Sequence, residues 1–241
     1  MTKVIKIILC IIIFFNLVLL GCVKDKFSVH KLLKNTKNSE GVDNSTLTNA
    51  VNCVELHDLD EYYLGYTAIM WACFRGHTEA VKYLIGKNVD LKIKSLKNET
   101  LLTLTLGRWD AALDNTKILL KKNDSRDAIN DELDDLGTTV VIQGAKDNVW
   151  SLIIKELIDN KAYINQVRKD GTTAIFFACE NGNEETVYYL LCKKNETDGK
   201  RWVTHLDKVT KSESTAREEC KKNEIPLPVE EEDSEVCTNY L

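Results

Sequence analysis

Apolar residues in the middle of the chain recur with the three- and four-residue spacing of short helices, in blocks that repeat. Residues 65–91 read GYTAIMWACFRGHTEAVKYLIGKNVDL, and a close copy, GTTAIFFACENGNEETVYYLLCKKN, occupies residues 171–195. Two weaker copies lie between them, and the threonines that anchor the four blocks are spaced by 33, 39 and 34 residues. These are Thr67, Thr100, Thr139 and Thr173. Because such a period fits a turn followed by two short antiparallel helices, the pattern predicts a repeat protein.

Each block divides into two amphipathic helices with a glycine between them. The Thr67 hydroxyl is expected to cap the first helix, and Gly76 is expected to supply the positive φ of the turn. Asn88 is expected to close the second helix in the left-handed conformation. The apolar stripe of the first block comprises Ile69, Ala72, Cys73, Val81, Leu84 and Ile85. One block cannot bury its own apolar face, so several blocks must stack.

These blocks resemble ankyrin repeats, whose motif contains Gly-x-Thr-Pro-Leu-His, Ala-Ala, Gly-His and a closing Leu-Leu pair. The resemblance covers about residues 60–194. Ala68 and Ala174 replace the usual proline, and Met70 and Phe176 replace the usual histidine. The resemblance implies an all-α ankyrin-repeat solenoid of about four repeats plus caps.

The N-terminal segment, residues 1–21, has the pattern of a signal peptide. Lys3 and Lys6 are followed by an apolar run at residues 7–20 that is short for a membrane-spanning helix. The run ends in Leu-Leu-Gly-Cys, which resembles a bacterial lipoprotein box, and the resemblance implies cleavage before Cys22 and acylation of its thiol. Several acyl chains together hold a protein firmly on a membrane. An uncleaved anchor and ordinary secretion are the alternatives.

The segments that flank the repeats are expected to be flexible at their outer ends and helical next to the repeats. Residues 22–45 are polar and predict a flexible tether, whereas residues 46–210 hold the repeats and their terminal caps. The apolar positions of residues 46–55 and 202–209 predict one capping helix at each end. Residues 211–241 are dense in charge and predict a disordered acidic tail, with a partner-binding tail as the alternative.

Composition and motifs narrow the function. The net charge is −5, and removal of a leader that contains Lys3 and Lys6 leaves 30 basic against 37 acidic residues, which argues against nucleic-acid binding. The four histidines are scattered, and the sequence has no CxxC, no HExxH and no Gly-rich phosphate loop. We therefore expect no catalytic residue, no metal, no cofactor and no small-molecule substrate.

The eight cysteines leave several pairings open. Cys73 and Cys179 occupy the same small position in distant repeats, so both are interpreted as buried thiols. Cys220 with Cys237, or Cys192 with either of them, are the candidate disulfides, and Cys53 is unassigned.

Ankyrin repeats are known for binding proteins through their concave first helices and loop fingers, and the resemblance implies the same here. Aromatic residues and arginine dominate binding hot spots. The predicted contact residues are Trp71, Phe74, Arg75 and Phe177, with Arg168 and Lys169 on a finger. Packing between first helices is the alternative role for Trp71 and Phe177. Arg108-Trp109-Asp110, in the degenerate second repeat, is a weaker candidate contact.

The sequence thus favours a monomeric, membrane-tethered adaptor of a bacterial cell envelope, with Cys22 in the membrane and an unidentified protein as partner. Two other functions remain. One is a surface-exposed structural or host-contact lipoprotein, and the other is a thiol-based redox protein that uses Cys73 or Cys179. The sequence does not distinguish the outer membrane from a periplasm-facing location.

Overall fold

The computed structural model describes residues 26–36, 44–52, 54–107, 111–122, 128–192, 207, 210 and 214–227. Every named element in these ranges is a helix, which confirms the predicted all-α class. The chain divides into two compact units, Met1–Asp90 (unit 1) and Leu91–Leu241 (unit 2).

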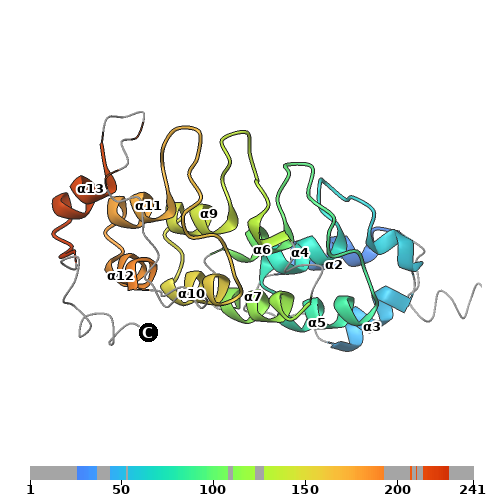
Figure 1. Cartoon of the computed structure of the whole chain (residues 1–241). Coiled ribbons are helices and arrows are strands. Elements are labelled where there is room, and N and C mark those ends of the chain that lie inside the picture. Colours follow the sequence, from blue (N-terminus) through green and yellow to red (C-terminus); the bar gives the residue numbers. More distant parts are fainter. Residues whose placement is uncertain are drawn as a thin grey trace, which may run out of the picture. The chain divides into compact units, whose positions relative to one another are not determined.

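The described residues of unit 1 form two helix pairs, which Figure 1 shows. Its elements are α2 (Ser28–Asn35), α3 (Asn44–Asn52), the 3-10 helix η1 (Leu56–Leu59), α4 (Ala68–Arg75) and α5 (Thr78–Gly86). Helix α2 packs on α4, and α3 packs on α5, so first helices lie beside first helices and second beside second. The loop before α4 is a finger that is closed by an isolated bridge between Tyr63 and Tyr66.

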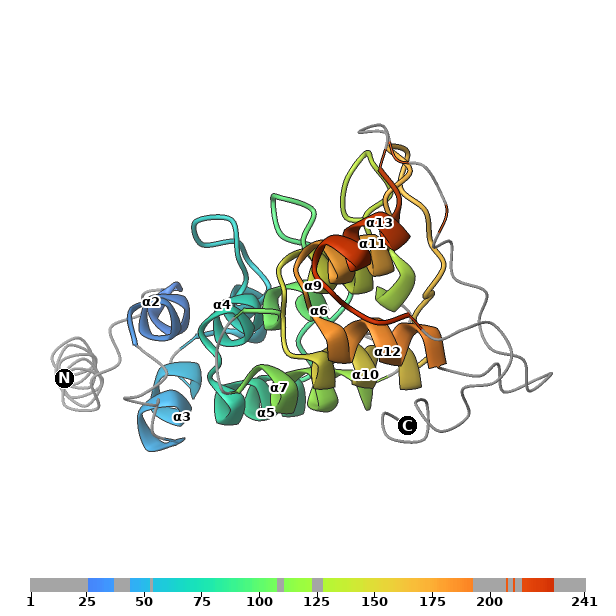
Figure 2. The same ribbon diagram turned by 90° about the vertical axis from the view of Figure 1, so that its left-hand side faces the viewer.

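Unit 2 is also built from two rows of helices. Its elements are α6 (Leu101–Thr105), α7 (Ala112–Leu120), the 3-10 helix η2 (Ala128–Asn130), α9 (Val140–Lys146), α10 (Ser151–Asp159), α11 (Ala174–Glu180), α12 (Glu184–Cys192) and α13 (Ala216–Lys222). Helices α6, α9, α11 and α13 form one row, and α7, α10 and α12 form the other. Figures 1 and 2 show both rows, with the fingers projecting beside the first row.

The helix ends follow the predicted signals with one exception. Gly76 and Asn88 have φ values of 73° and 58°, as the turn and the left-handed cap require. The Thr173 hydroxyl accepts the Phe176 N–H at 3.3 Å. Thr67 is the N-cap of α4 and faces the Met70 N–H in a capping box, but its buried hydroxyl makes no hydrogen bond of normal geometry. Its backbone N–H lies 3.4 Å from the sulfur of Met70, the residue that replaces the motif histidine.

Two segments predicted to be irregular contain helices. Helix α2 lies in the predicted tether, where Val29, His30 and Leu33 are spaced to share one face and are buried. Helix α13 lies in the predicted tail, where Ala216 and Cys220 are buried and Thr215 and Glu218 form a capping box. In α13 only two of the seven residues are fully buried, and the charged residues around them gave no apolar pattern from which a helix could be predicted. Most of the capping helix predicted at residues 202–209 lies outside the described residues.

Candidate protein-interaction surfaces

In unit 1, α4 carries three of the predicted contact residues. Trp71 is only 6% exposed, and its indole N–H donates to the Tyr63 carbonyl at 3.0 Å. Phe74 is 39% exposed, and the Arg75 guanidinium lies 5.7 Å from the centre of its ring. Trp71 therefore has a packing role, whereas Phe74 is presented to solvent.

Other aromatic rings extend this cluster beyond the predicted residues. Tyr66 lies 4.9 Å from Trp71 and 5.9 Å from Phe74 between ring centres. Tyr63 lies 5.2 Å from Phe27, which precedes α2. We call these five rings the aromatic–basic surface of unit 1, together with the four cations that lie over them, Lys26, Lys31, Lys34 and Arg75. Sequence reasoning missed Phe27 because it treated its segment as a tether, and it left Tyr63 without a role.

In unit 2, Arg168 and Phe177 do come together. Arg168 lies on the finger before α11 and is 7% exposed, with its guanidinium 5.5 Å from the centre of the Phe177 ring. Its Nη1 donates to the Thr172 hydroxyl at 3.0 Å and forms an ion pair with Asp170 at 3.1 Å. Its Nε is buried without a hydrogen-bond partner. Phe177 is also mostly buried, so both residues help to build the surface on which exposed neighbours are displayed.

The finger turns are held by aspartates. Asp170 accepts hydrogen bonds from the N–H and the hydroxyl of Thr172. Burial acts to raise the pKa of the Asp170 carboxyl, but these hydrogen bonds and the charge of Arg168 outweigh it and lower the pKa. Lys169 is exposed, and its N–H donates to the Leu136 carbonyl of the preceding finger at 2.8 Å. This hydrogen bond joins the finger before α11 to the finger before α9.

A hollow of about 580 Å³ opens between the finger, α11 and α13 in unit 2. Its lining residues are Lys146, Arg168, Asp170, Thr172, Phe176, Phe177, Glu180, Ser214, Glu219 and Lys222. Lys146 and Glu180 are exposed and end their helices, while Lys222 forms an ion pair with Glu219. The hollow thus has an aromatic floor and a rim of both charges, which suits the apolar core and polar rim of a protein interface.

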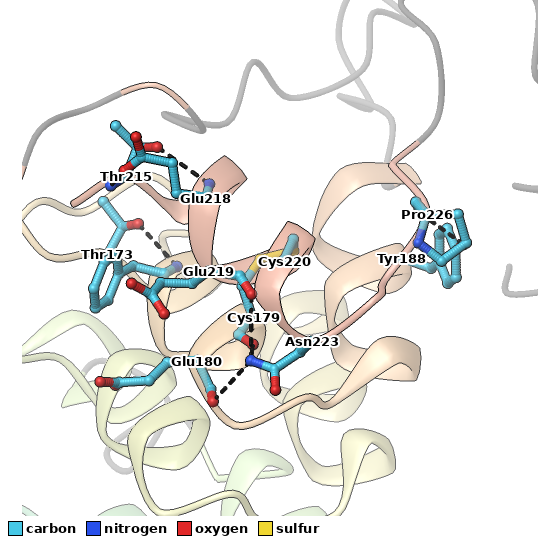
Figure 3. The surroundings of a disulfide bond; sticks show 11 residues. Thr173, Cys179, Glu180, Tyr188, Thr215, Glu218, Glu219, Cys220, Asn223 and Pro226 are labelled. Carbon is cyan, nitrogen blue, oxygen red and sulfur yellow. Dashed lines mark hydrogen bonds between the residues drawn. A yellow bond between two sulfur atoms is a disulfide. The ribbon is translucent and has the colours of Figure 1, made fainter.

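Helix α13 is one wall of this hollow, and it repeats features of α11. The Asn223 amide donates to the Cys179 and Glu180 carbonyls at 2.9 and 3.3 Å, as Figure 3 shows. Asn181 makes the same contacts with the last carbonyls of α9, at 2.9 and 3.1 Å. Both the capping threonines and these asparagines are 42 residues apart, so α13 has the place of the first helix of a further repeat. That spacing was the sequence signal for it.

Comparison with known proteins identifies the family. A family profile described as Ankyrin repeats (3 copies) matches residues 22–125 and 109–201. The chain belongs to the ankyrin repeat family. Its fold is similar to that of a chain from the solved complex of the predatory endopeptidase Bd0816 from Bdellovibrio bacteriovorus with immunity protein Bd3460. That likeness has a TM-score of 0.61 and 23% sequence identity, and covers 83% of this chain and 93% of that one.

The cysteines of these ankyrin repeats differ from prediction at Cys179, which was interpreted as a free thiol, and at Cys220, which was expected to pair with Cys237 or Cys192. Cys179 is not a free thiol but forms a disulfide with Cys220 (Figure 3). The two residues were assigned separately because α13 was not expected to pack on α11. Cys192 is also disulfide-bonded. Cys73 is a buried free thiol, as predicted, and burial raises its pKa to about 12, which disfavours the reactive thiolate.

Several predicted features remain untested. Cys22, Cys53, Cys237 and residues 108–110 lie outside the described residues. Within the described ranges, no helix has the length and apolar character needed to cross a membrane. The same ranges contain one group with suitable atoms for a metal, His57, Asp58 and Glu61. Because Glu61 already pairs with Lys26 and such groups are common without metals, we assign no metal site.

Proposed function

We infer that this ankyrin-repeat protein is a protein-binding adaptor of a bacterial cell envelope, tethered to a membrane through Cys22. The observation that carries the inference is the hollow of unit 2. It is lined by the successive first helices α9 and α11, a finger and α13, which hydrogen bonds and a disulfide join to one another. A preorganised surface of this kind binds without a large ordering cost.

Two further observations support this function. The solved complex with a similar fold joins an endopeptidase and an immunity protein, so the fold occurs in an assembly of two proteins. Disulfides such as that between Cys179 and Cys220 form in oxidising compartments outside the cytoplasm, and an exported lipoprotein would lie in such a compartment. Cys73 is buried and Cys179 is bonded, which argues against thiol chemistry as the function.

The test is crosslinking in intact cells, followed by capture of the tagged chain from the envelope and mass spectrometry. The double charge reversal Lys146→Glu/Glu180→Lys changes the rim of the hollow without touching buried residues. We expect it to lower recovery of the partner by about tenfold, because charges at an interface fix partner choice. In the same cells, Cys22→Ala is expected to move the chain from the membrane to the soluble fraction.

The matched control is Asp114→Lys/Lys117→Glu, which exchanges two exposed charges on α7, in the other helix row. Circular dichroism should be the same for both variants. Equal partner recovery with both would contradict the assignment of the hollow. Failure to recover any protein, with an acylated Cys22 peptide present, would favour the surface-lipoprotein alternative.

A further inference from the structure

The aromatic–basic surface of unit 1 concentrates positive charge over aromatic rings. Lys26 lies 5.0 Å from the centre of the Phe27 ring, and Lys31 and Lys34 lie 5.9 and 5.7 Å from that of Tyr63. Lys34 also lies 6.0 Å from Trp71. With Arg75, these make four of the six lysines and arginines in the described part of unit 1. The cations therefore share one surface rather than spreading over the unit.

Four acidic side chains of unit 1 bond to a backbone N–H group or to a lysine, and one of these lysines belongs to the aromatic–basic surface. Glu79 pairs with Lys82 on α5, and Asp60 accepts the Asp90 N–H at 3.0 Å. The carboxylate of Asp58 accepts the Glu55 N–H in the cap of η1. Glu61 pairs with Lys26 at the edge of the aromatic–basic surface. The described residues of unit 1 carry six basic and six acidic side chains, so the gathering of four cations at the aromatic–basic surface is a local feature.

We propose that the aromatic–basic surface of unit 1 binds a segment of a protein partner that carries both acidic and apolar side chains. A cation above a ring can pair with a carboxylate while it keeps its contact with the ring. Phe74, Tyr62 and Leu64 expose 39%, 38% and 64% of their surface and offer apolar contact beside these charges. This proposal rests on the proposed function, because it names the chemistry of a protein partner.

An anionic membrane would supply the same negative charge, but the geometry favours a peptide. Aromatic residues that anchor a protein at a bilayer must stand at its most exposed points. Here Trp71 is buried, Tyr63 is half-buried beneath Lys31 and Lys34, and Tyr66 is half-buried against Trp71. An individual side chain of a peptide can reach these rings between the cations, whereas a flat lipid surface would reach mainly Leu64 and Phe74.

The test is fluorescence anisotropy with the full chain in detergent and a labelled peptide that alternates glutamate with phenylalanine and serine. We expect saturable binding that weakens with added salt and falls about tenfold when glutamine replaces glutamate. Lys34→Glu/Arg75→Glu should lower the affinity by about tenfold or more. The control Lys82→Glu/Lys87→Glu makes the same change of charge on α5 and should bind as the wild type does.

Three results would overturn the proposal. They are equal affinity in the two charge-reversal variants, equal affinity for the glutamine peptide, and binding only to phosphatidylcholine vesicles that contain phosphatidylglycerol. The Lys146→Glu/Glu180→Lys variant separates this proposal from the general function. If this variant no longer recovers the cellular partner and the wild type does not bind the acidic peptide, the adaptor function stands and the acidic-segment proposal fails.

Discussion

His30 and His77 are buried residues whose neutral form holds α2 in unit 1. The His30 Nε2–H donates to the Glu61 carbonyl at 3.0 Å, and its Nδ1 is buried without a partner. His77 Nε2 lies 2.8 Å from the hydroxyl of Thr36, which ends α2. Burial lowers the pKa of both imidazoles, and the charge of Arg75 lowers that of His77 further. A second proton on either ring would need hydration that the packed surroundings do not provide.

This arrangement predicts that acid weakens unit 1. The unfolded chain takes up protons on these histidines near pH 6.5, before the folded chain does, so stability is lost as pH falls below that value. His77→Asn, which places there the residue found at the equivalent Asn183, should flatten this dependence. The measurement is urea unfolding at several pH values between about 5 and 8. His57→Asn, at an exposed site, is the control, and equal slopes in both variants would contradict the role of His77.

At the scale of elements, the repeated blocks could be predicted because the sequence of each block marks both the ends of its helices and their buried face. The block from Gly65 to Leu91 contains caps, a glycine turn and an apolar stripe at helical spacing, and its helices appear where expected. Helix α13 could not be predicted in this way, because only its two small residues, Ala216 and Cys220, are buried. Its place is fixed by long-range contacts, including the hydrogen bond of the Tyr188 hydroxyl to the Pro226 carbonyl.

Removal of the disulfide should release α13. The bond joins residues 41 positions apart, and closure of a loop of that length stabilises a fold by about 4 kcal/mol in the chain-entropy description. In Cys220→Ser we expect faster hydrogen exchange at residues 215–225 and earlier thermal unfolding of unit 2. Cys73→Ser removes a buried free thiol from unit 1 and is the control. Unchanged protection of α13 in Cys220→Ser would show that its hydrogen bonds suffice to hold it.

At the scale of the whole molecule, the sequence indicated the surfaces but not how deeply each residue lies in them. Trp71 and Phe177 were predicted as contacts because they are aromatic residues of the concave first helices, yet both are mostly buried. Burial depends on neighbouring repeats, here the fingers that supply Tyr63 and Arg168. The hollow in unit 2 has α13 as one wall, so it could not be predicted from a sequence pattern that did not indicate this helix.

Repeat arrays are stabilised by contacts between neighbouring repeats, so local damage should stay local. Gly144 lies where α9 meets α10, and a Cβ there would be 2.7 Å from Ile154 Cδ1 and 3.2 Å from Val149 Cγ2. Gly144→Val should therefore cost about 1–3 kcal/mol through overpacking. By hydrogen exchange we expect lost protection in α9, α10 and α11, with α4 and α5 unchanged. Gly86→Ala, where no atom lies within 4 Å of the new Cβ, is the tolerated control. Equal loss of protection in α4 and α5 would mean that the whole array unfolds as one cooperative body.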